Sequence, residues 1–179
     1  KGGMIMTNFA MQNLLTRRAI RSYKPDPIPS DVLDRILEAG TYAPSGMSKQ
    51  SAIILAVTDK KVRDELSALN AQIANHPGED PFYGAPVVLV VLADRKVPTY
   101  VEDGSLVLGN LMNAAHAEGL GSCWIHRARQ EFDGEYGKQL LARLGIEGDY
   151  VGIGHCILGY VDGDYPQPHP RKPNYIYKI

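Results

Sequence analysis

The sequence predicts a single-domain protein in which helices and β-strands alternate. Its 179 residues can bury one hydrophobic core, and 44% of them are hydrophobic while 22% are charged, which is typical of a globular domain. Segments with apolar residues at helical spacing alternate with short apolar runs, and residues 87–92 form an unbroken apolar run suited to a central strand covered on both faces. Taken alone, this alternation favours a parallel sheet.

Two helices separated by a proline-rich connection are predicted for the first quarter of the chain. Thr7 or Asn8 can cap a first helix, in which apolar residues recur at helical spacing. The prolines of residues 24–29 exclude a helix there, because each proline restricts the residue before it. Ser30 is then predicted to cap a second helix, which stops near residues 40–44.

The middle of the chain contains two predicted strands and two predicted helices. Residues 52–58 have the pattern of a buried strand, and Asp59 is expected to open the helix that follows. After the central strand, a helix over residues 103–118 is apolar around most of its circumference, so two of its faces must be shielded. A chain this short has little to cover both faces, and we expect a second subunit to cover one of them.

The last third of the chain is predicted to end in an extended arm. A strand over residues 122–126, a helix over residues 131–144 and a glycine-rich strand over residues 151–161 precede it. Residues 166–173 are rich in proline and therefore extended, and the alternating sequence of residues 174–179 predicts a strand-like tip. Such an arm is expected to reach outward and dock elsewhere.

The composition excludes several classes of protein. A net charge of −1 argues against a nucleic-acid or membrane-surface binder, which normally carries a basic surplus. Cys123 and Cys156 lie far apart without a CxxC pair, so we expect no disulfide framework and a reducing, cytoplasmic location. The apolar runs are shorter than the roughly 18 residues of a membrane span, and residues 1–6 are expected to be disordered or tag-derived.

The common nucleotide-binding and catalytic motifs are missing from the sequence. Residues 152–157 lack the third glycine of the dinucleotide-binding motif, and residues 137–139 lack the Ser or Thr of a P-loop. No nucleophile elbow or catalytic triad is recognisable, and the histidines show no metal-ligand spacing, so we expect no metal and no catalytic side chain. If the protein is an enzyme, a bound cofactor is expected to carry the chemistry.

Three arginines, Arg17, Arg18 and Arg21, follow the first predicted helix within five positions. Guanidinium groups keep their charge and form paired hydrogen bonds with phosphate, so this cluster is a candidate phosphate clamp. The alternative is a solvated helix end, because the helix macrodipole also favours cations there. The cluster alone supports both interpretations equally.

Four segments, in this order along the chain, resemble the FMN-dependent nitroreductase family. They are the arginine cluster followed by Ser22-Tyr23, the Ala43–Met47 turn with Gln50, the Gly119–Ile125 segment and the Pro-Arg-Lys-Pro sequence of the terminal arm. Each segment is modest alone, but together they extend the resemblance over nearly the whole chain.

The resemblance implies an α+β fold in which a central, mainly antiparallel sheet is flanked by helices, in place of a parallel sheet. It also implies an intertwined homodimer with two FMN molecules at the subunit boundary. The exchanged C-terminal arm, residues 166–179, would dock on the partner subunit, within a single nitroreductase-like domain formed by residues 1–179.

The same resemblance assigns the FMN phosphate to basic residues at both ends of the chain. These are Arg17, Arg18 and Arg21 after the first helix, with Arg171 and Lys172 on the arm. Relatives often carry serine at the position of Ala19, so one hydrogen bond to phosphate, worth about 1.5 to 3 kcal/mol, is missing here. The backbone or water would supply that contact.

A loop of small residues is implied to lie against the flavin ring held by the other subunit. Small side chains permit close approach of the backbone. The loop consists of Pro44, Ser45, Gly46, Met47 and Ser48, followed by Gln50. The chain departs from the family at Ser48, where asparagine is usual, and at Ser51-Ala52, where proline-tryptophan is usual.

Two further parts of the ring site are implied by the resemblance. Asn70 corresponds to a residue that hydrogen-bonds the pyrimidine edge of the flavin, and the alternative is a solvent-facing helix residue. The end of the strand formed by Trp124, Ile125, His126 and Arg127 would lie under the ring, where a backbone amide near flavin N5 would stabilise the reduced state. Trp124 could equally be a core aromatic residue.

The activity implied by the resemblance is that of an NAD(P)H oxidoreductase. NADH or NADPH would pass a hydride to flavin N5 and leave, and a small-molecule acceptor such as a nitroaromatic or quinone would then be reduced in the same space, with ping-pong kinetics. The alternatives are a specialised flavin enzyme of the same superfamily, such as a dehydrogenase or dehalogenase, a non-catalytic FMN carrier or sensor, and a small nucleic-acid module.

Overall fold

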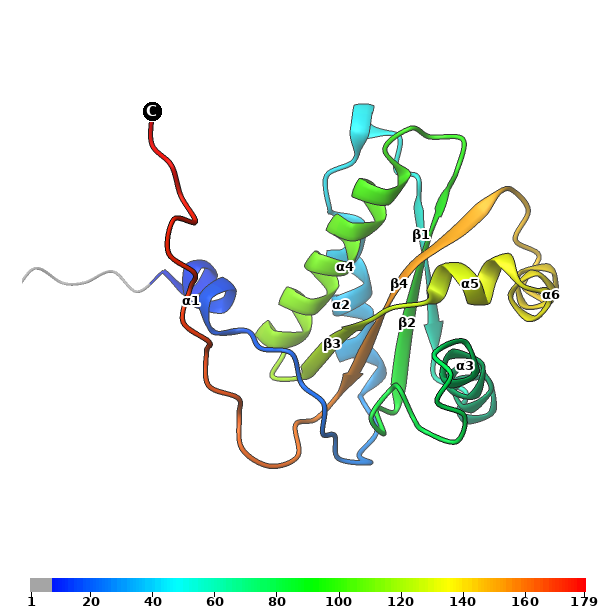
Figure 1. Cartoon of the computed structure of the whole chain (residues 1–179), viewed down its shortest axis with the longest axis horizontal. Coiled ribbons are helices and arrows are strands. Elements are labelled where there is room, and N and C mark those ends of the chain that lie inside the picture. Colours follow the sequence, from blue (N-terminus) through cyan, green and yellow to red (C-terminus); the bar gives the residue numbers. More distant parts are fainter. Residues whose placement is uncertain (1–7) are drawn as a thin grey trace, which may run out of the picture.

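The computed structural model describes residues 8–179 and contains a four-stranded sheet between two layers of helices (Figure 1). The strands lie in the order β1-β2-β4-β3, and every neighbouring pair is antiparallel. Their bounds are Ala52–Val57 for β1, Val87–Asp94 for β2, Gly121–Ile125 for β3 and Tyr150–Gly159 for β4. The expected α+β architecture is confirmed, and the parallel sheet suggested by the alternation is wrong.

The antiparallel pairing of β1 with β2 follows from the long connection between them. Helix α3 (Lys60–Ile73) and residues 74–86 lead from the end of β1 to the start of β2, where Val88 pairs with Val57. Phe82 fixes this connection because its side chain is fully buried. Alternation in sequence therefore did not imply parallel strands, because this connection ends beside the end of β1, and β2 then runs in the opposite direction.

Two layers of helices cover the two faces of the sheet (Figure 1). Helices α2 (Ser30–Thr41) and α4 (Tyr100–Ala117) pack on one face, where their leucines and isoleucines share a buried cluster with β2 and β4. Helix α3, with α5 (Ala128–Asp133) and α6 (Glu135–Arg143), packs on the other. Every residue of β2 from Val87 to Ala93 is buried, as expected for the central apolar run.

Both ends of the described chain, residues 8–16 and 162–179, project from this sandwich. Helix α1 (Phe9–Thr16) has no buried residue, and residues 162–179 extend beside it without a regular strand (Figure 1). Asn8 caps α1 by accepting a hydrogen bond from the amide of Met11 at 3.1 Å. Thr7, the alternative cap, and residues 1–6 lie outside the described residues. The strand expected at the arm's tip is not formed within the protomer.

Several helix boundaries differ from the predictions. Asp59 caps α3 through a 2.9 Å bond from the amide of Val62, as expected. Ser30 does not cap α2, because the carbonyl of Pro29 already accepts the first helical bond, from Leu33. The helix predicted over residues 131–144 is two helices, since the backbone at Gly134 is extended. Helix α4 begins three residues earlier than predicted.

The described residues contain neither a membrane-spanning helix nor a cluster of metal-binding side chains. Between residues 8 and 179, no helix combines the length and the apolar character needed to cross a lipid bilayer. Over the same residues, no group of three or more His, Cys, Asp or Glu side chains is placed to hold a metal ion.

Strand β4 and the start of α5 approach each other more closely than side chains would allow. A Cβ atom added at Gly152 would lie 2.2 Å from the carbonyl oxygen of Ala128. The oxygen and the carbon of this carbonyl, which lies 2.3 Å away, both belong to the backbone, so neither atom can move aside by a change of rotamer. A glycine at this position is therefore needed to seat α5 on the sheet.

We predict that Gly152→Ala lowers the free energy of unfolding by about 3 kcal/mol, the upper part of the range for overpacking. Chemical denaturation monitored by circular dichroism measures this change. Ala68→Ser, which also adds one heavy atom but on an exposed helix surface, should stay within about 0.5 kcal/mol of the unmodified protein. Equal stability of the two variants would contradict the close approach.

Candidate functional site

Residues 17–23, called the arginine segment below, lie along the edge of β3 that does not pair with β4. The amide of Ile20 donates to the carbonyl of Ser122 at 2.9 Å, and Ala19 pairs with Ser122 in a parallel bridge. Buried side chains hold the segment at both sides of this pairing, Ile20 in the core and Tyr23 against Val161. The segment is therefore fixed to the sheet, although it forms no strand of its own.

The three arginines have different roles in the protomer. Arg18 donates through Nη1 to the carbonyls of Leu15 at 2.9 Å and Arg17 at 2.7 Å, which closes the end of α1. The side chains of Arg17 and Arg21 form no hydrogen bond or ion pair with any residue from 8 to 179. The helix-end interpretation therefore describes Arg18, and the phosphate-clamp interpretation stays open for Arg17 and Arg21.

The pKa of a neighbouring histidine reports the positive charge of this segment. His116, at the end of α4, has a lowered pKa, first because of burial and second because of the charges of Arg17 and Arg18. Its Nε2 contacts the hydroxyl of Thr16 at 2.8 Å, and its ring stacks on Tyr165 with centroids 5.9 Å apart. The hydroxyl of Tyr165 in turn accepts from the amide of Arg18 at 2.9 Å. The base of the terminal arm is thus attached to the arginine segment.

A cavity of about 530 Å³ opens beside the arginine segment. Its polar lining is mixed, because Arg18 and Arg21 face Asp162 and Asp164 across it. The hydroxyl of Ser122, which is paired with Ala19, is buried and has no hydrogen-bond partner in the described chain. Of the two arginines without a partner, Arg21 lines this cavity and could bind an anionic group such as phosphate, whereas Arg17 and Ser122 do not line it.

The basic residues of the arm do not reach this cavity within one protomer. Arg171 donates to the carbonyl of His169, and Lys172 lies over the ring of Tyr175. Neither residue lines the cavity. Their predicted contact with phosphate stays a prediction.

The turn from β3 to α5 is held by a fully buried asparagine. Asn70 donates through Nδ2 to the carbonyl of His126 at 2.8 Å, and its Oδ1 accepts from Nε of Arg127 at 3.0 Å. Asn70 has no exposed surface, so it is not the solvent-facing helix residue of the alternative interpretation. Arg127 has a φ of 78°, which is uncommon for a residue with a side chain.

A second cavity, of about 500 Å³, lies beside this turn. It is bounded by the first half of α4, the end of β3, α5 and β4. Trp124, His126 and Arg127 line it, so three of the four residues predicted under the flavin ring share one cavity. The fourth, Ile125, points into the core on the other face of the sheet. Trp124 also packs on α4, so it is partly a core aromatic residue.

The loop of residues 44–50 adopts a strained backbone. Three of its residues that carry side chains have φ between 47° and 53°: Met47, Ser48 and Gln50. Such conformations cost about 1 to 3 kcal/mol each and cluster at functional sites. Met47 is 78% exposed, and exposure of its apolar side chain to water contributes no stability to the protomer.

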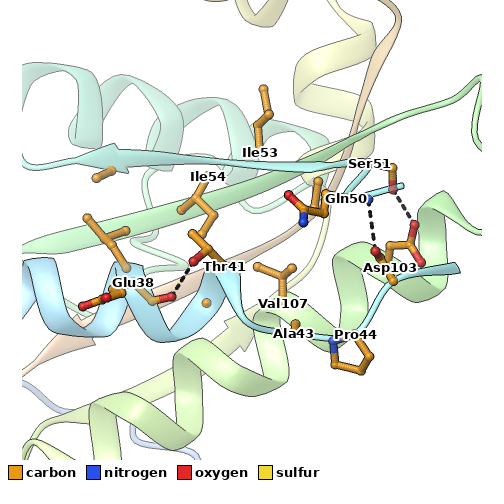
Figure 2. A pocket seen from close by; sticks show the side chains of 15 residues that line it. Glu38, Thr41, Ala43, Pro44, Gln50, Ser51, Ile53, Ile54, Asp103 and Val107 are labelled. Carbon is orange, nitrogen blue, oxygen red and sulfur yellow. Dashed lines mark hydrogen bonds between the residues drawn. The ribbon is translucent and has the colours of Figure 1, made fainter. Parts of the chain in front are cut away.

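A buried carboxylate, Asp103, holds this loop in place. Its Oδ1 accepts from the amide of Gly46 at 2.9 Å, and its Oδ2 accepts from the hydroxyls of Ser51 at 2.6 Å and Thr99 at 3.1 Å. The bond from Ser51 is drawn in Figure 2. Burial raises the pKa of Asp103, but these three donors outweigh it and hold the pKa below its usual value. Asp103 was not singled out from the sequence, since its partners lie 4, 52 and 57 positions away.

A cavity of about 440 Å³ lies between this loop, α2, β1 and α4 (Figure 2). Ile53, Ile54 and Val107 form much of its apolar wall. Ser45, Gln50 and Asp103 provide polar groups at the end nearest the loop. The loop is therefore backed by a partly apolar hollow and is not packed solidly against its own protomer.

The predicted site residues lie in two places. Strands β1 and β3 are opposite edges of the sheet, with β2 and β4 between them. The loop of residues 44–50 precedes β1, whereas the arginine segment and the Trp124–Arg127 turn lie at β3. This separation is the one expected if the loop serves the site of another subunit.

Comparison with known proteins identifies the family. The Nitroreductase family model matches residues 14–160. The chain belongs to the nitroreductase family. A nitroreductase with bound FMN from Bacteroides fragilis has a similar structure, with a TM-score of 0.88, 28% sequence identity, and coverage of 97% of this chain and 100% of that one.

Two sequence relatives with described activities support the same family. An NADPH-flavin oxidoreductase from Vibrio harveyi is 28% identical over 180 residues, covering 94% of this chain and 72% of that protein. An FMN reductase [NAD(P)H] from Bacillus subtilis is 28% identical over 145 residues, covering 68% of this chain. The chain spans only 55% of the Bacillus subtilis protein and 63% of a relative from Methanothermobacter thermautotrophicus.

We predict that Asp103→Asn lowers the free energy of unfolding at pH 7 by about 2 kcal/mol, because hydrogen bonds to a buried carboxylate are lost. A depressed pKa in the folded state means that the carboxylate contributes stability above its unfolded pKa of about 3.9 and loses that contribution as pH falls further. The difference between the two proteins should therefore shrink below pH 4. Urea denaturation between pH 3 and pH 7 measures it.

The matched control for this prediction is Asp26→Asn, in the exposed proline-rich connection. Its stability should follow that of the unmodified protein at every pH. A constant difference between Asp103→Asn and the unmodified protein across this pH range would show that the charge of Asp103 does not hold the loop.

Proposed function

We propose that this protein is an FMN-dependent NAD(P)H oxidoreductase that reduces nitroaromatics, quinones or similar acceptors. Relatives named as an NADPH-flavin oxidoreductase and an FMN reductase, and a similar structure with bound FMN, support the cofactor and the electron donor. The short connection of residues 75–85, which holds few groups that could bind a zwitterion, supports a general reductase over a specialised enzyme of the superfamily.

One observation carries the proposal, the attachment of the arginine segment to the strand that ends at Trp124–Arg127. Ala19 pairs with Ser122, and His126, directly after the end of β3, is four residues further along the chain, about 13 Å away for an extended backbone. Free cations thus lie at one end of a strand and a cavity with free backbone donors at the other. A mononucleotide with a phosphate at one end and a ring at the other fits this arrangement.

Each part of the chain has a separate task in this function. Arg17 and Arg21 would bind the phosphate, while Trp124 and the turn beside it would form the floor of the ring site. FMN, when bound, would supply the hydride chemistry between NADH or NADPH and the acceptor. Val101, Val151 and Ile153 would give the ring site an apolar part of its wall, and no side chain is required as a nucleophile.

We further propose that the functional unit is a homodimer with exchanged arms. Large apolar side chains are exposed at both ends of the described chain, an arrangement that marks an interaction surface when they gather in one region. They are Phe9, Leu14 and Leu15 on α1, and Tyr175, Ile176 and Tyr177 on the arm. A partner would cover these residues and bring its own loop of residues 44–50 to the flavin.

The cytoplasmic location expected from the sequence fits the state of the thiols. Cys123 and Cys156 are free and buried, and burial raises the pKa of both thiols. Buried protonated thiols are inert, and neither contributes to the proposed reaction.

The proposed function predicts a yellow protein whose flavin absorbance bleaches on anaerobic addition of NADH or NADPH. Menadione or nitrofurazone should then restore the oxidised spectrum, because the reduced cofactor would pass its two electrons to the acceptor. Absorbance spectroscopy in a sealed cuvette follows both steps. A non-catalytic carrier would bind FMN and stay oxidised, and material that does not bind FMN at all would contradict the proposal.

We predict that Arg17→Ala and Arg21→Ala each weaken FMN binding about tenfold or more, the effect of losing a charge-assisted hydrogen bond. Riboflavin, which lacks the phosphate, should bind both variants as it binds the unmodified protein, and the melting temperature of the apoprotein should not change. Isothermal titration calorimetry with FMN and with riboflavin measures the dissociation constant of each variant for both flavins.

Two further arginine variants control this experiment. Arg143→Ala, at the end of α6, should leave both affinities unchanged. Arg18→Ala should lower the melting temperature of the apoprotein as well, because Arg18 closes α1. Equal losses of FMN and riboflavin binding in the Arg17 and Arg21 variants would show that these residues hold the fold and not the phosphate.

A further inference from the structure

A fully buried pair of titratable side chains lies directly behind the β3–α5 turn. Nε2 of His155, on β4, is 2.5 Å from Oε2 of Glu131, on α5, and neither side chain has exposed surface. Nδ1 of His155 lies 3.0 Å from the carbonyl oxygen of Ile125. Because a carbonyl can only accept, Nδ1 must carry a proton, and a second proton is shared between Nε2 and the carboxyl group.

The surroundings keep this pair in a single arrangement. The ring of Phe82 packs on the imidazole of His155 with centroids 5.2 Å apart and is itself fully buried. Neither member has an alternative partner in water, so the imidazole keeps its bond to Ile125. The pair therefore acts as a rigid anchor on one particular carbonyl.

The next carbonyl along the chain has its own buried anchor. Asn70 donates to the carbonyl of His126 and accepts from Arg127, as described above. Two consecutive carbonyl groups, those of Ile125 and His126, are thus bound by side chains that have no exposed surface. Arg127, the residue that follows, is held at a φ of 78°.

Because the peptide bond is planar, fixing the two carbonyl groups also fixes the directions of the amides of His126 and Arg127. No peptide bond among residues 8–179 is cis, so each carbonyl and the amide that follows it point in opposite directions. The amide of His126 points away from His155, and the amide of Arg127 points away from Asn70. Neither amide has an acceptor within the described chain.

We propose that Glu131 and His155 are positioning residues of the flavin site, which act with Asn70 by turning the amides of His126 and Arg127 toward the cofactor. Two fixed amide dipoles stabilise negative charge without reorganisation, so their orientation favours the reduced, anionic state of the flavin. This inference rests on the proposed function. Glu131 and His155 would not touch the cofactor, but they would influence its reduction potential.

The test compares a variant that removes the anchor with one that keeps it. Replacing both members, Glu131→Leu with His155→Leu, removes the anchor without leaving a buried charge unpaired, so the fold should persist. Glu131→Gln keeps the anchor, because its amide can donate to Nε2 while Nδ1 still donates to Ile125. The midpoint potential of bound FMN is measured for both variants by spectroelectrochemical titration.

We expect the double variant to bind reduced flavin at least tenfold less favourably relative to oxidised flavin, a shift of about 30 mV to more negative potential for a two-electron couple. Glu131→Gln should keep the potential of the unmodified protein. The amide resonances of His126 and Arg127, observed by NMR as FMN is added, should shift less in the double variant than in the other two proteins.

A second variant keeps the test decisive if the double variant does not melt cooperatively. Asn70→Ser removes the anchor on the second carbonyl only, and we expect it to shift the potential in the same direction. Unchanged potentials and amide shifts in a folded anchor variant would overturn the positioning role while leaving the flavin function intact. Failure of the unmodified protein to bind FMN would instead overturn the proposed function, and this inference with it.

Discussion

The candidate site depends on one strand, β4, which pairs with both β2 and β3 and presents almost no side chains where other parts must approach. At Gly152 the backbone of α5 lies against it, and at Gly154 an added Cβ would meet the indole of Trp124 at 2.8 Å. A Cβ added at Gly159 would meet the ring of Tyr23, also at 2.8 Å. The turn, the floor of the ring site and the arginine segment are thus all seated on one strand, although on different faces of it, so displacement of β4 would displace all three.

Strained backbone at two segments of the candidate site is paired with a buried polar side chain from a different element. Asp103 on α4 holds the loop in which Met47, Ser48 and Gln50 adopt positive φ, and Asn70 on α3 holds Arg127. A conformation costing 1 to 3 kcal/mol persists only where surrounding structure over-determines it. These anchors therefore fix the shape of two short segments, which fits a site whose donors must be fixed before a ligand arrives.

Local sequence signals predicted the elements whose causes are local. The cap at Asp59 and the buried run of β2 were visible because each depends on neighbours within a few positions. The direction of the strands was not visible, because it depends on the return of residues 74–86. Glu131 and His155, 24 positions apart, meet only when α5 packs on β4, so no spacing rule could have joined them. Family resemblance located Asn70 and the turn, but not the bonds that Asn70 makes.

The division of the site between the two edges of the sheet explains why a protomer of this size exposes so much apolar surface. Arg17 and Arg21 keep unpaired charges at β3, while the strained loop at β1 ends in an exposed Met47. Within residues 8–179 the two arginines have no side-chain partner, and Met47 leaves an apolar side chain in water although Asp103 holds the loop. Two copies arranged so that the loop of one faces the turn of the other would cover that side chain. On this argument the dimer is a condition for a complete site, and the affinity for FMN should depend on protein concentration wherever the dimer dissociates.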